Sequence, residues 1–203
     1  MEIIATTARE LCPGSLAERL PLLAASGPDG ILLREKDLPE AEYEELARLG
    51  AAACRRHGVA FGAHSRPWAA RRLGLVWLHL SWAAFLAREA DTRAELGEFA
   101  RVGVSVHAAE EAARAARWGA DYVLAGHVFT TASKAGLPGR GLGFLRAVRA
   151  AVPETPVYAI GGIGPDNIGA VGACGVRGVF LMSAVMTAPA PREYIAALRR
   201  GLP

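Results

Sequence analysis

The stretch that follows a short apolar run at residues 122–125 combines the side chains best suited to chemistry. It reads Gly126-His127-Val128-Phe129-Thr130-Thr131-Ala132-Ser133-Lys134. Histidine can take up and return a proton near neutral pH, so His127 at a strand end is a candidate general acid and base. The hydroxyls and Lys134 that follow it predict a loop able to fold over a ligand. The alternative interpretation is that His127 is structural.

Two later stretches carry groups that suit an anion. Ile160-Gly161-Gly162-Ile163-Gly164-Pro165 places glycines, whose backbone a ligand can approach closely, before a proline typical of a first helical turn. Met182-Ser183-Ala184 adds a hydroxyl and further amides. Free amides at a helix start favour phosphate, so we expect a phosphate site here. Alternatively, the glycines serve only a tight turn.

Two other strand ends carry polar residues that allow more than one interpretation. Arg34 either binds a carboxylate or phosphate through its planar guanidinium or forms an internal ion pair with Glu35 or Asp37. Ser105 and His107 share one face of their strand by the period-two rule. If one of these two contacts a ligand, the other lies close to it.

The alternation of apolar and helical segments predicts the elements that position these residues. Short apolar runs alternate with Ala/Arg/Glu-rich segments whose apolar residues recur every three or four positions, which is typical of β and α units in turn. We predict eight strands, at Glu2–Ala5, Gly30–Arg34, Val59–Ala63, Leu75–Leu78, Val102–His107, Tyr122–Ala125, Val157–Ile160 and Val179–Met182.

Helices are predicted at Leu38–His57, Arg66–Leu73, Ala108–Trp118, Leu142–Ala151, Pro165–Cys174 and Pro191–Arg200. A glycine just past a helix end supports three of these boundaries, at Gly58, Gly119 and Gly175. Eight βα units in 203 residues close most naturally into a (β/α)8 TIM barrel, an α/β fold that we expect to form one domain over residues 1–203. An open doubly wound sheet could use the same alternation, but no Gly-x-Gly-x-x-Gly follows the first strand.

Composition narrows the class of protein. Hydrophobic residues make up 52% of the chain and charged residues 21%, which suits a sheet buried under helices. The net charge of +3 is spread along the predicted helices, which argues against a nucleic-acid partner. No apolar run is long enough to span a bilayer, so no membrane partner is expected. Homo-oligomerisation is compatible with the sequence.

Cysteine usage and the first residues indicate the cytoplasm. The cysteines at positions 12, 54 and 174 are far apart and never spaced as metal-ligand pairs, so we expect free thiols in a reducing compartment. The stretch of residues 1–10 lacks the basic flank and apolar core of a signal peptide. We therefore expect a cytoplasmic protein.

Several stretches together resemble the thiamin phosphate synthase superfamily over essentially the whole chain. They are Leu33-Arg34-Glu35-Lys36-Asp37, Gly103-Val104-Ser105-Val106-His107, Gly119-Ala120-Asp121-Tyr122-Val123, Gly126-His127-Val128-Phe129 and Ala159-Ile160-Gly161-Gly162-Ile163. Within that group, the fourth stretch, followed by Thr131, Lys134 and Gly139-Arg140-Gly141, is similar to the thiazole tautomerase (TenI) branch. Synthases usually have a proline at the place of His127.

A second difference from the synthases concerns magnesium. Synthases typically carry an Asn-Asp pair after the third strand and an acidic residue after the fourth, which help bind magnesium and the diphosphate substrate. Here these places read Ala63-His64-Ser65 and His79-Leu80-Ser81-Trp82. Without carboxylates an oxygen-ligated magnesium site is hard to build, so no metal is expected. His64 and His79 either line the barrel mouth or only pack.

The resemblance implies an isomerase, a thiazole tautomerase of thiamin biosynthesis that needs no cofactor. His127 would move one proton from the ring carbon that bears the carboxylate, in a phosphorylated carboxythiazole, and return one to the exocyclic alkene carbon. Residue-by-residue matching also implies that Gly161, Gly162, Met182 and Ser183 hold the phosphate. By the same matching, the substrate site is lined by Arg34, Ser105, Thr131 and Lys134.

Two other functions stay open at this point. One is a magnesium-dependent thiamin phosphate synthase, which joins a pyrimidine diphosphate to a thiazole phosphate. The other is a non-catalytic barrel that binds a phosphorylated thiamin precursor and regulates through a partner.

Overall fold

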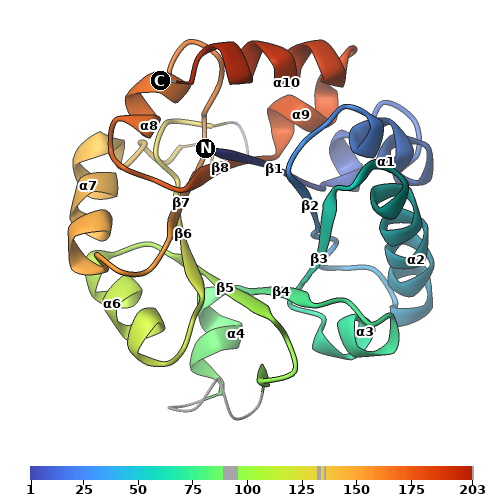
Figure 1. Ribbon diagram of the computed structural model, residues 1–203, viewed down its shortest axis with the longest axis horizontal. Helices are drawn as coiled ribbons and strands as arrows, with labels where there is room; N and C mark the ends of the chain where they lie inside the picture. The colour runs from blue at the N-terminus through green and yellow to red at the C-terminus, as the bar shows by residue number, and fades with distance from the viewer. Residues whose placement is uncertain (89–95, 132–133, 135, 203) are drawn as a thin grey trace.

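The computed structural model describes residues 1–88, 96–131, 134 and 136–202. Parallel strands form a closed barrel in chain order, and the helices surround it (Figure 1). The strands are β1 (Glu2–Thr6), β2 (Gly30–Leu33), β3 (Ala60–His64), β4 (Trp77–Leu80), β5 (Arg101–Val106), β6 (Tyr122–Gly126), β7 (Val157–Ile160) and β8 (Gly178–Leu181).

Closure of the barrel depends on the pairing of the first strand with the last. β1 runs parallel to β8, with Ile4 opposite Phe180 and Ala5 opposite Leu181. Each of the eight strands therefore has a hydrogen-bonded neighbour on both sides. The predicted (β/α)8 barrel is confirmed, and the open doubly wound alternative is excluded.

The helices cover the outside of the barrel through their apolar faces. They are η1 (Arg9–Leu11), α1 (Leu16–Ala25), α2 (Glu40–His57), α3 (Pro67–Arg72), α4 (Trp82–Leu86), α6 (Ala109–Arg117), α7 (Gly141–Ala151), α8 (Ile168–Gly172), α9 (Ser183–Thr187) and α10 (Pro191–Arg200). The left-handed glycine predicted after α2 is present, since Gly58 has a φ of 65°. Within the described ranges no helix is long and apolar enough to cross a membrane. The three cysteines are free, as predicted.

Several elements differ from the prediction: η1, α1 and α9 were not predicted, and the bounds of several strands shift by one or two residues. Helix α1 was not predicted because Pro21 lies inside it, although a capping box formed by Ser15 and Glu18 marks its start. Strand β4 begins two residues later than expected, because pairing with β5 sets its register and places Trp77 opposite Arg101. The apolar Val76 belongs to the preceding turn and is 59% exposed. As a result, His79 lies within the strand and not after it.

Side chains that point to the barrel axis form a separate interior core. Because successive residues of a strand face opposite sides, one set packs against the helices and the other fills the barrel. The apolar members of the inner set are Ile4, Leu32, Trp77, Tyr122, Leu124, Tyr158 and Phe180.

The side chain of Arg101 lies at the amino-terminal end of this interior. The Arg101 guanidinium lies 4.8 Å from the ring centroids of both Trp77 and Tyr122. It also donates hydrogen bonds to the Tyr158 hydroxyl at 2.6 Å and to a Glu2 carboxylate oxygen at 3.3 Å. The half-buried charge is therefore paired with a carboxylate and faced by aromatic rings.

Two histidines lie toward the other end of the barrel interior. His79 is fully buried and His64 is 7% exposed, with their ring centroids 5.6 Å apart. Burial lowers the pKa of His79 well below its ordinary value. Burial, followed by the charges of Arg34 and Lys36, lowers the pKa of His64 to about 3. Both imidazoles are therefore neutral at physiological pH.

A glycine on β5 makes room for the largest interior ring. A Cβ atom placed on Gly103 would lie 1.9 Å from Cζ of Tyr122, which occupies the facing position on β6. The ring is fully buried and has no open space to move into. Only glycine fits at position 103 with Tyr122 beside it.

We expect Gly103→Ala to lower the free energy of unfolding by about 1–3 kcal/mol or more, the cost of overpacking a core. Gly143→Ala is the matched control, because a Cβ atom at this exposed position of α7 meets nothing within 4 Å. It should raise stability by about 0.5–1 kcal/mol through helix propensity. Denaturant unfolding measures both, and equal effects of the two variants would contradict this account of the interior.

Acid should destabilise the fold through the two buried histidines. Their pKa values in the folded chain are below the ordinary value of 6.5, so the unfolded chain binds more protons as the pH falls below 6.5. Stability is fully present above that pH. Each histidine should cost about 1.4 kcal/mol per pH unit below it, until the folded pKa is reached. His64→Gln should flatten the unfolding free energy between pH 6.5 and about pH 4, whereas His57→Gln, at the exposed end of α2, should not.

Candidate active site

A cavity of about 590 Å³ opens at the carboxyl ends of the strands. This is the end of a TIM barrel at which active sites are built. All the residues predicted to form the site line this one cavity, although they come from five different strand ends and loops: Arg34, Ser105, His127, Thr131, Lys134, Gly161, Gly162, Met182 and Ser183. Strand alternation explains why Arg34, Ser105 and Met182 face the cavity, because each continues the inward-facing series of residues of its strand.

The loop after β7 needs its two glycines. Gly161 and Gly162 have φ angles of 107° and 64°, in the region that side chains with a Cβ rarely adopt. Added Cβ atoms would lie 2.5 Å from His127 Cβ and from the Thr130 carbonyl oxygen, respectively. The Asn167 side chain holds the turn, since it accepts from the Gly164 amide and donates to the Gly162 carbonyl, both at 2.9 Å. The backbone of this turn forms one wall of the cavity.

His127 sits where the loop after β6 leaves the barrel. Its Nε2 lies 3.0 Å from the carbonyl oxygen of Pro138, which can only accept, so Nε2 carries a hydrogen and donates it. Backbone hydrogen bonds from Val128 to Ile160 and from Arg140 back to His127 fasten both ends of the loop. The predicted loop is thus anchored at its base, and residues 132, 133 and 135 of it lie outside the described residues.

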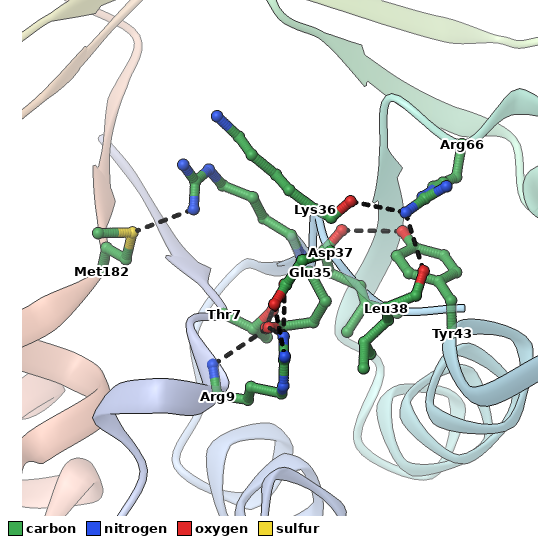
Figure 2. A network of polar contacts seen from close by, with 11 residues as sticks. Thr7, Arg9, Glu35, Lys36, Asp37, Leu38, Tyr43, Arg66 and Met182 are labelled. Carbon is green, nitrogen blue, oxygen red and sulfur yellow. Dashed lines mark hydrogen bonds and ion pairs between the residues drawn. The ribbon is translucent and has the colours of Figure 1, made fainter. Parts of the chain in front are cut away.

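Arg34 does not make the ion pair that was one interpretation of the sequence. The partner of both neighbouring carboxylates is Arg9, which binds Asp37 through two contacts of 2.6 and 2.7 Å and reaches Glu35 at 3.4 Å (Figure 2). The Thr7 hydroxyl donates to Glu35 at 2.6 Å and accepts from the Arg34 amide at 2.9 Å. This network fixes the end of β2 and turns residues 35 and 37 away from the cavity.

The guanidinium of Arg34 instead faces the cavity, with Nη1 3.9 Å from the Met182 sulfur. Lys36, two residues on, lies on the same side, and Lys134 approaches from the loop after β6. Burial, and next the charges of Arg34 and Lys134, lower the pKa of Lys36. Such mutual repulsion suits a site that binds an anion. We call Arg34, Lys36 and Lys134 the cation cluster.

Lys36 was not among the predicted site residues, although the sequence carries a signal for it. Only two of the 23 Lys and Arg residues are lysines, namely Lys36 and Lys134, and both line the cavity. A compact ammonium and an extended guanidinium bind anions differently. The restriction of lysine to these two positions is therefore the sequence signal that marks Lys36 as a site residue.

Two buried polar atoms also line the cavity without a hydrogen-bond partner among the described residues. They are Oγ1 of Thr6 and Nδ1 of His64. Buried polar atoms are nearly always paired, so these two are available to a bound molecule. His64 and His79 both line the cavity, which settles their position at the mouth.

The donor set of the cavity does not suit magnesium. Its lining contains histidines, hydroxyls, arginine and lysines but no aspartate or glutamate within the described ranges. In the same part of the chain there is no group of three His, Cys, Asp or Glu residues that could hold a metal ion. Magnesium prefers carboxylate oxygens and water, and the cation cluster would repel it.

Comparison with known proteins identifies the family. The sequence model of the TMP-TENI family, described as thiamine monophosphate synthase, matches residues 3–185. A thiamine-phosphate synthase of Thermobifida fusca is 38% identical over 190 residues, which cover 93% of this chain and 86% of that protein. One of Moorella thermoacetica is 41% identical over 178 residues, which cover 87% of this chain and 81% of that protein.

Solved structures agree with this result. A thiamine phosphate pyrophosphorylase from Pyrococcus furiosus superposes with a TM-score of 0.83 at 30% identity, covering 98% of this chain and 94% of that one. A 3-hexulose-6-phosphate synthase superposes with a TM-score of 0.73 at 19% identity, over the full length of both chains, and shows only the shared barrel.

These findings correct the function expected from the sequence. The thiazole tautomerase prediction, which was based on the histidine of Gly126-His127-Val128-Phe129, is wrong, because relatives matching along most of the chain are named thiamine-phosphate synthases. The superfamily inferred from the five stretches is confirmed. This chain belongs to the thiamine monophosphate synthase family.

Proposed function

We propose that this chain is a thiamine-phosphate synthase. In this reaction the ring nitrogen of a thiazole phosphate attacks the methylene carbon of a pyrimidine diphosphate, and the C–O bond to the diphosphate breaks. The bonding electrons leave with the diphosphate, so no oxidant or reductant is needed. The observation that carries the proposal is 36–41% identity to proteins of that name over about nine-tenths of the chain. The cavity supports it by offering two separate groups of anion-binding features.

The first feature would hold the phosphate of the thiazole. The turn at Gly161 and Gly162 presents bare backbone to the cavity, and the Ser183 hydroxyl lies at the start of α9 beside it. Backbone amides in such a turn, together with one hydroxyl, form a small concave surface for an anion. Met182 lines the cavity next to Ser183 and offers an apolar contact for the substrate. The loops after strands seven and eight are the usual phosphate site of TIM barrels.

The second feature, the cation cluster, would hold the diphosphate. Negative charge builds up on the leaving group as the C–O bond breaks, so fixed positive charges near it stabilise the transition state more than the ground state. Arg34 offers a planar fork for two oxygens, whereas Lys36 and Lys134 provide compact charges from opposite sides of the mouth. The free energy of their mutual repulsion would be relieved when the anion binds.

His127, Ser105 and Thr131 line the same cavity as these two features. Joining the two substrates removes no proton from carbon, so the transfer itself requires no general base. We therefore assign His127 to positioning of the thiazole, through Nδ1 or the face of its ring. The Gly126-His127-Val128-Phe129 stretch is then a variation within the synthases and not a sign of another activity.

The resemblance to the synthases implies that magnesium takes part in the reaction, but the side chains that line this cavity do not fit a magnesium ion. The positions at which a carboxylate would be expected are His64, Ser65 and Ser81, and His64 and Ser81 line the cavity together with the cation cluster. The chain's own cations would therefore neutralise the diphosphate.

The direct test is an assay of the purified protein with both substrates, in buffer that contains magnesium ions. Thiamine phosphate and diphosphate should appear in equal amounts, and omission of either substrate should abolish both. Ser183→Ala should raise KM for the thiazole phosphate by about ten-fold, the loss of one hydrogen bond to a charged group, with a smaller effect on the pyrimidine diphosphate. Absence of thiamine phosphate from a protein that binds both substrates would overturn the proposal.

The cation cluster can be tested because the chain has so few lysines. Inorganic diphosphate should protect Lys36 and Lys134 from an amine-selective acylating reagent, as measured by peptide mass spectrometry, since the bound anion covers both ammonium groups. Lys134→Arg keeps the charge and removes the amine, so it should retain protection at Lys36. Labelling of both lysines at an unchanged rate in saturating diphosphate would contradict the assignment.

A further inference from the structure

A continuous line of hydrogen bonds crosses the barrel interior and ends at the cavity. The Trp77 indole Nε1 lies 2.9 Å from the Tyr122 hydroxyl, which lies 2.8 Å from Nδ1 of His79. Nε2 of the same imidazole lies 2.9 Å from Oγ of Ser105. The first three side chains are buried, with exposed fractions of 0–2%, whereas Ser105 is half-buried and lines the cavity.

The direction of the first two hydrogen bonds follows from the chemistry of the groups. An indole N–H can only donate, so the Tyr122 oxygen accepts from Trp77. Burial raises the pKa of Tyr122, so its hydroxyl keeps its hydrogen. That buried hydrogen needs an acceptor, and Nδ1 of His79 lies within hydrogen-bond distance of the hydroxyl oxygen. The tyrosine therefore donates to the imidazole.

The direction of the last hydrogen bond follows in turn. Burial keeps His79 neutral, so its ring carries one hydrogen, and a lone pair on Nδ1 places that hydrogen on Nε2. Nε2 then donates to the Ser105 oxygen. The opposite tautomer would leave the buried Tyr122 hydrogen without an acceptor, which costs more free energy than a typical hydrogen bond contributes.

We infer that Trp77, Tyr122 and His79 are positioning residues, which fix the Ser105 hydroxyl as a hydrogen-bond donor toward the cavity. The serine oxygen accepts the imidazole N–H with one lone pair, so its own hydrogen is not used in that bond and can be donated to a molecule in the cavity. A substrate that presents a lone pair at this point, such as an unprotonated ring nitrogen, can accept that hydrogen. The identity of that substrate rests on the proposed function, whereas the direction of the relay does not.

The fold builds this relay from three neighbouring strands. His79 on β4 lies opposite Gly103 on β5, and Gly103 lies opposite Tyr122 on β6. The missing side chain at Gly103 lets the tyrosine ring cross above β5 and reach the imidazole. Ser105 is the next inward-facing residue of β5, one step closer to the mouth.

The tautomer can be measured without any ligand. Nitrogen NMR of histidine-labelled protein should show His79 with a hydrogen on Nε2 and a bare Nδ1, and Tyr122→Phe should shift this equilibrium. A hydrogen on Nδ1 in the unaltered protein would overturn the inference, whether or not the protein makes thiamine phosphate. Failure of the synthase assay with the expected tautomer would remove the proposed function and leave the relay standing.

Binding of thiazole phosphate and of the pyrimidine diphosphate, each measured by calorimetry, tests the consequence for the ligand. Ser105→Ala should weaken one of the two by about ten-fold, as should Tyr122→Phe, and the double variant should lose no more than either single one. Tyr158→Phe is the matched control, since its hydroxyl bonds Glu2 and Arg101 at the far end of the interior. Independent, additive losses, or unchanged binding of both ligands by Ser105→Ala and Tyr122→Phe, would overturn the inference.

Discussion

Hydrogen bonding between β1 and β8 forces every strand of this chain to present alternate side chains to a closed interior. A side chain that points inward can only pack, pair or face the cavity at the carboxyl end. The same period of two therefore places Arg101 as a plug at one end and Ser105 at the other, on a single strand. The interior core and the site belong to one continuous arrangement, so a change in register would move both at once.

The turn after β2 separates charges of opposite sign. Arg34 and Lys36 face the cavity, whereas Glu35 and Asp37 turn outward and bind Arg9. The carboxylates are thus paired where they stabilise the strand end, and the cavity keeps its positive charge. The buried histidines fit this environment because they stay neutral, since a charged imidazole beside Arg34 would be repelled as well as desolvated.

The sequence was sufficient to predict the barrel because the alternation of apolar and amphipathic segments reports directly on βα units. It also predicted a single cavity lined by Arg34, Ser105 and Ser183, because strand ends of a barrel converge on one face. The bounds of β4 were not predicted correctly. Nothing within the apolar run 75–78 indicates where the strand begins, because its register is set by pairing with β5. His79 was consequently left open.

The function could not be predicted from local motifs alone. A four-residue stretch around His127 favoured an isomerase, whereas identity spread over most of the chain favours a transferase. A lone imidazole can position a ring as well as carry a proton, and nothing in its neighbours along the sequence distinguishes these roles. Lys36 was missed for a different reason: it lies in the turn after β2, within a run of charged residues, and only the folded chain places it at the cavity.

The outward pairing of Glu35 and Asp37 with Arg9 has a consequence beyond the stability of one strand end. Because those carboxylates pair with Arg9, and the described residues that line the cavity include no aspartate or glutamate, the cation cluster gives the mouth a positive potential. Phosphorylated molecules would be drawn in from beyond contact distance, over the roughly 8–10 Å Debye length of a physiological electrolyte. The rate of capture, more than the strength of holding, would then depend on the ionic strength of the medium.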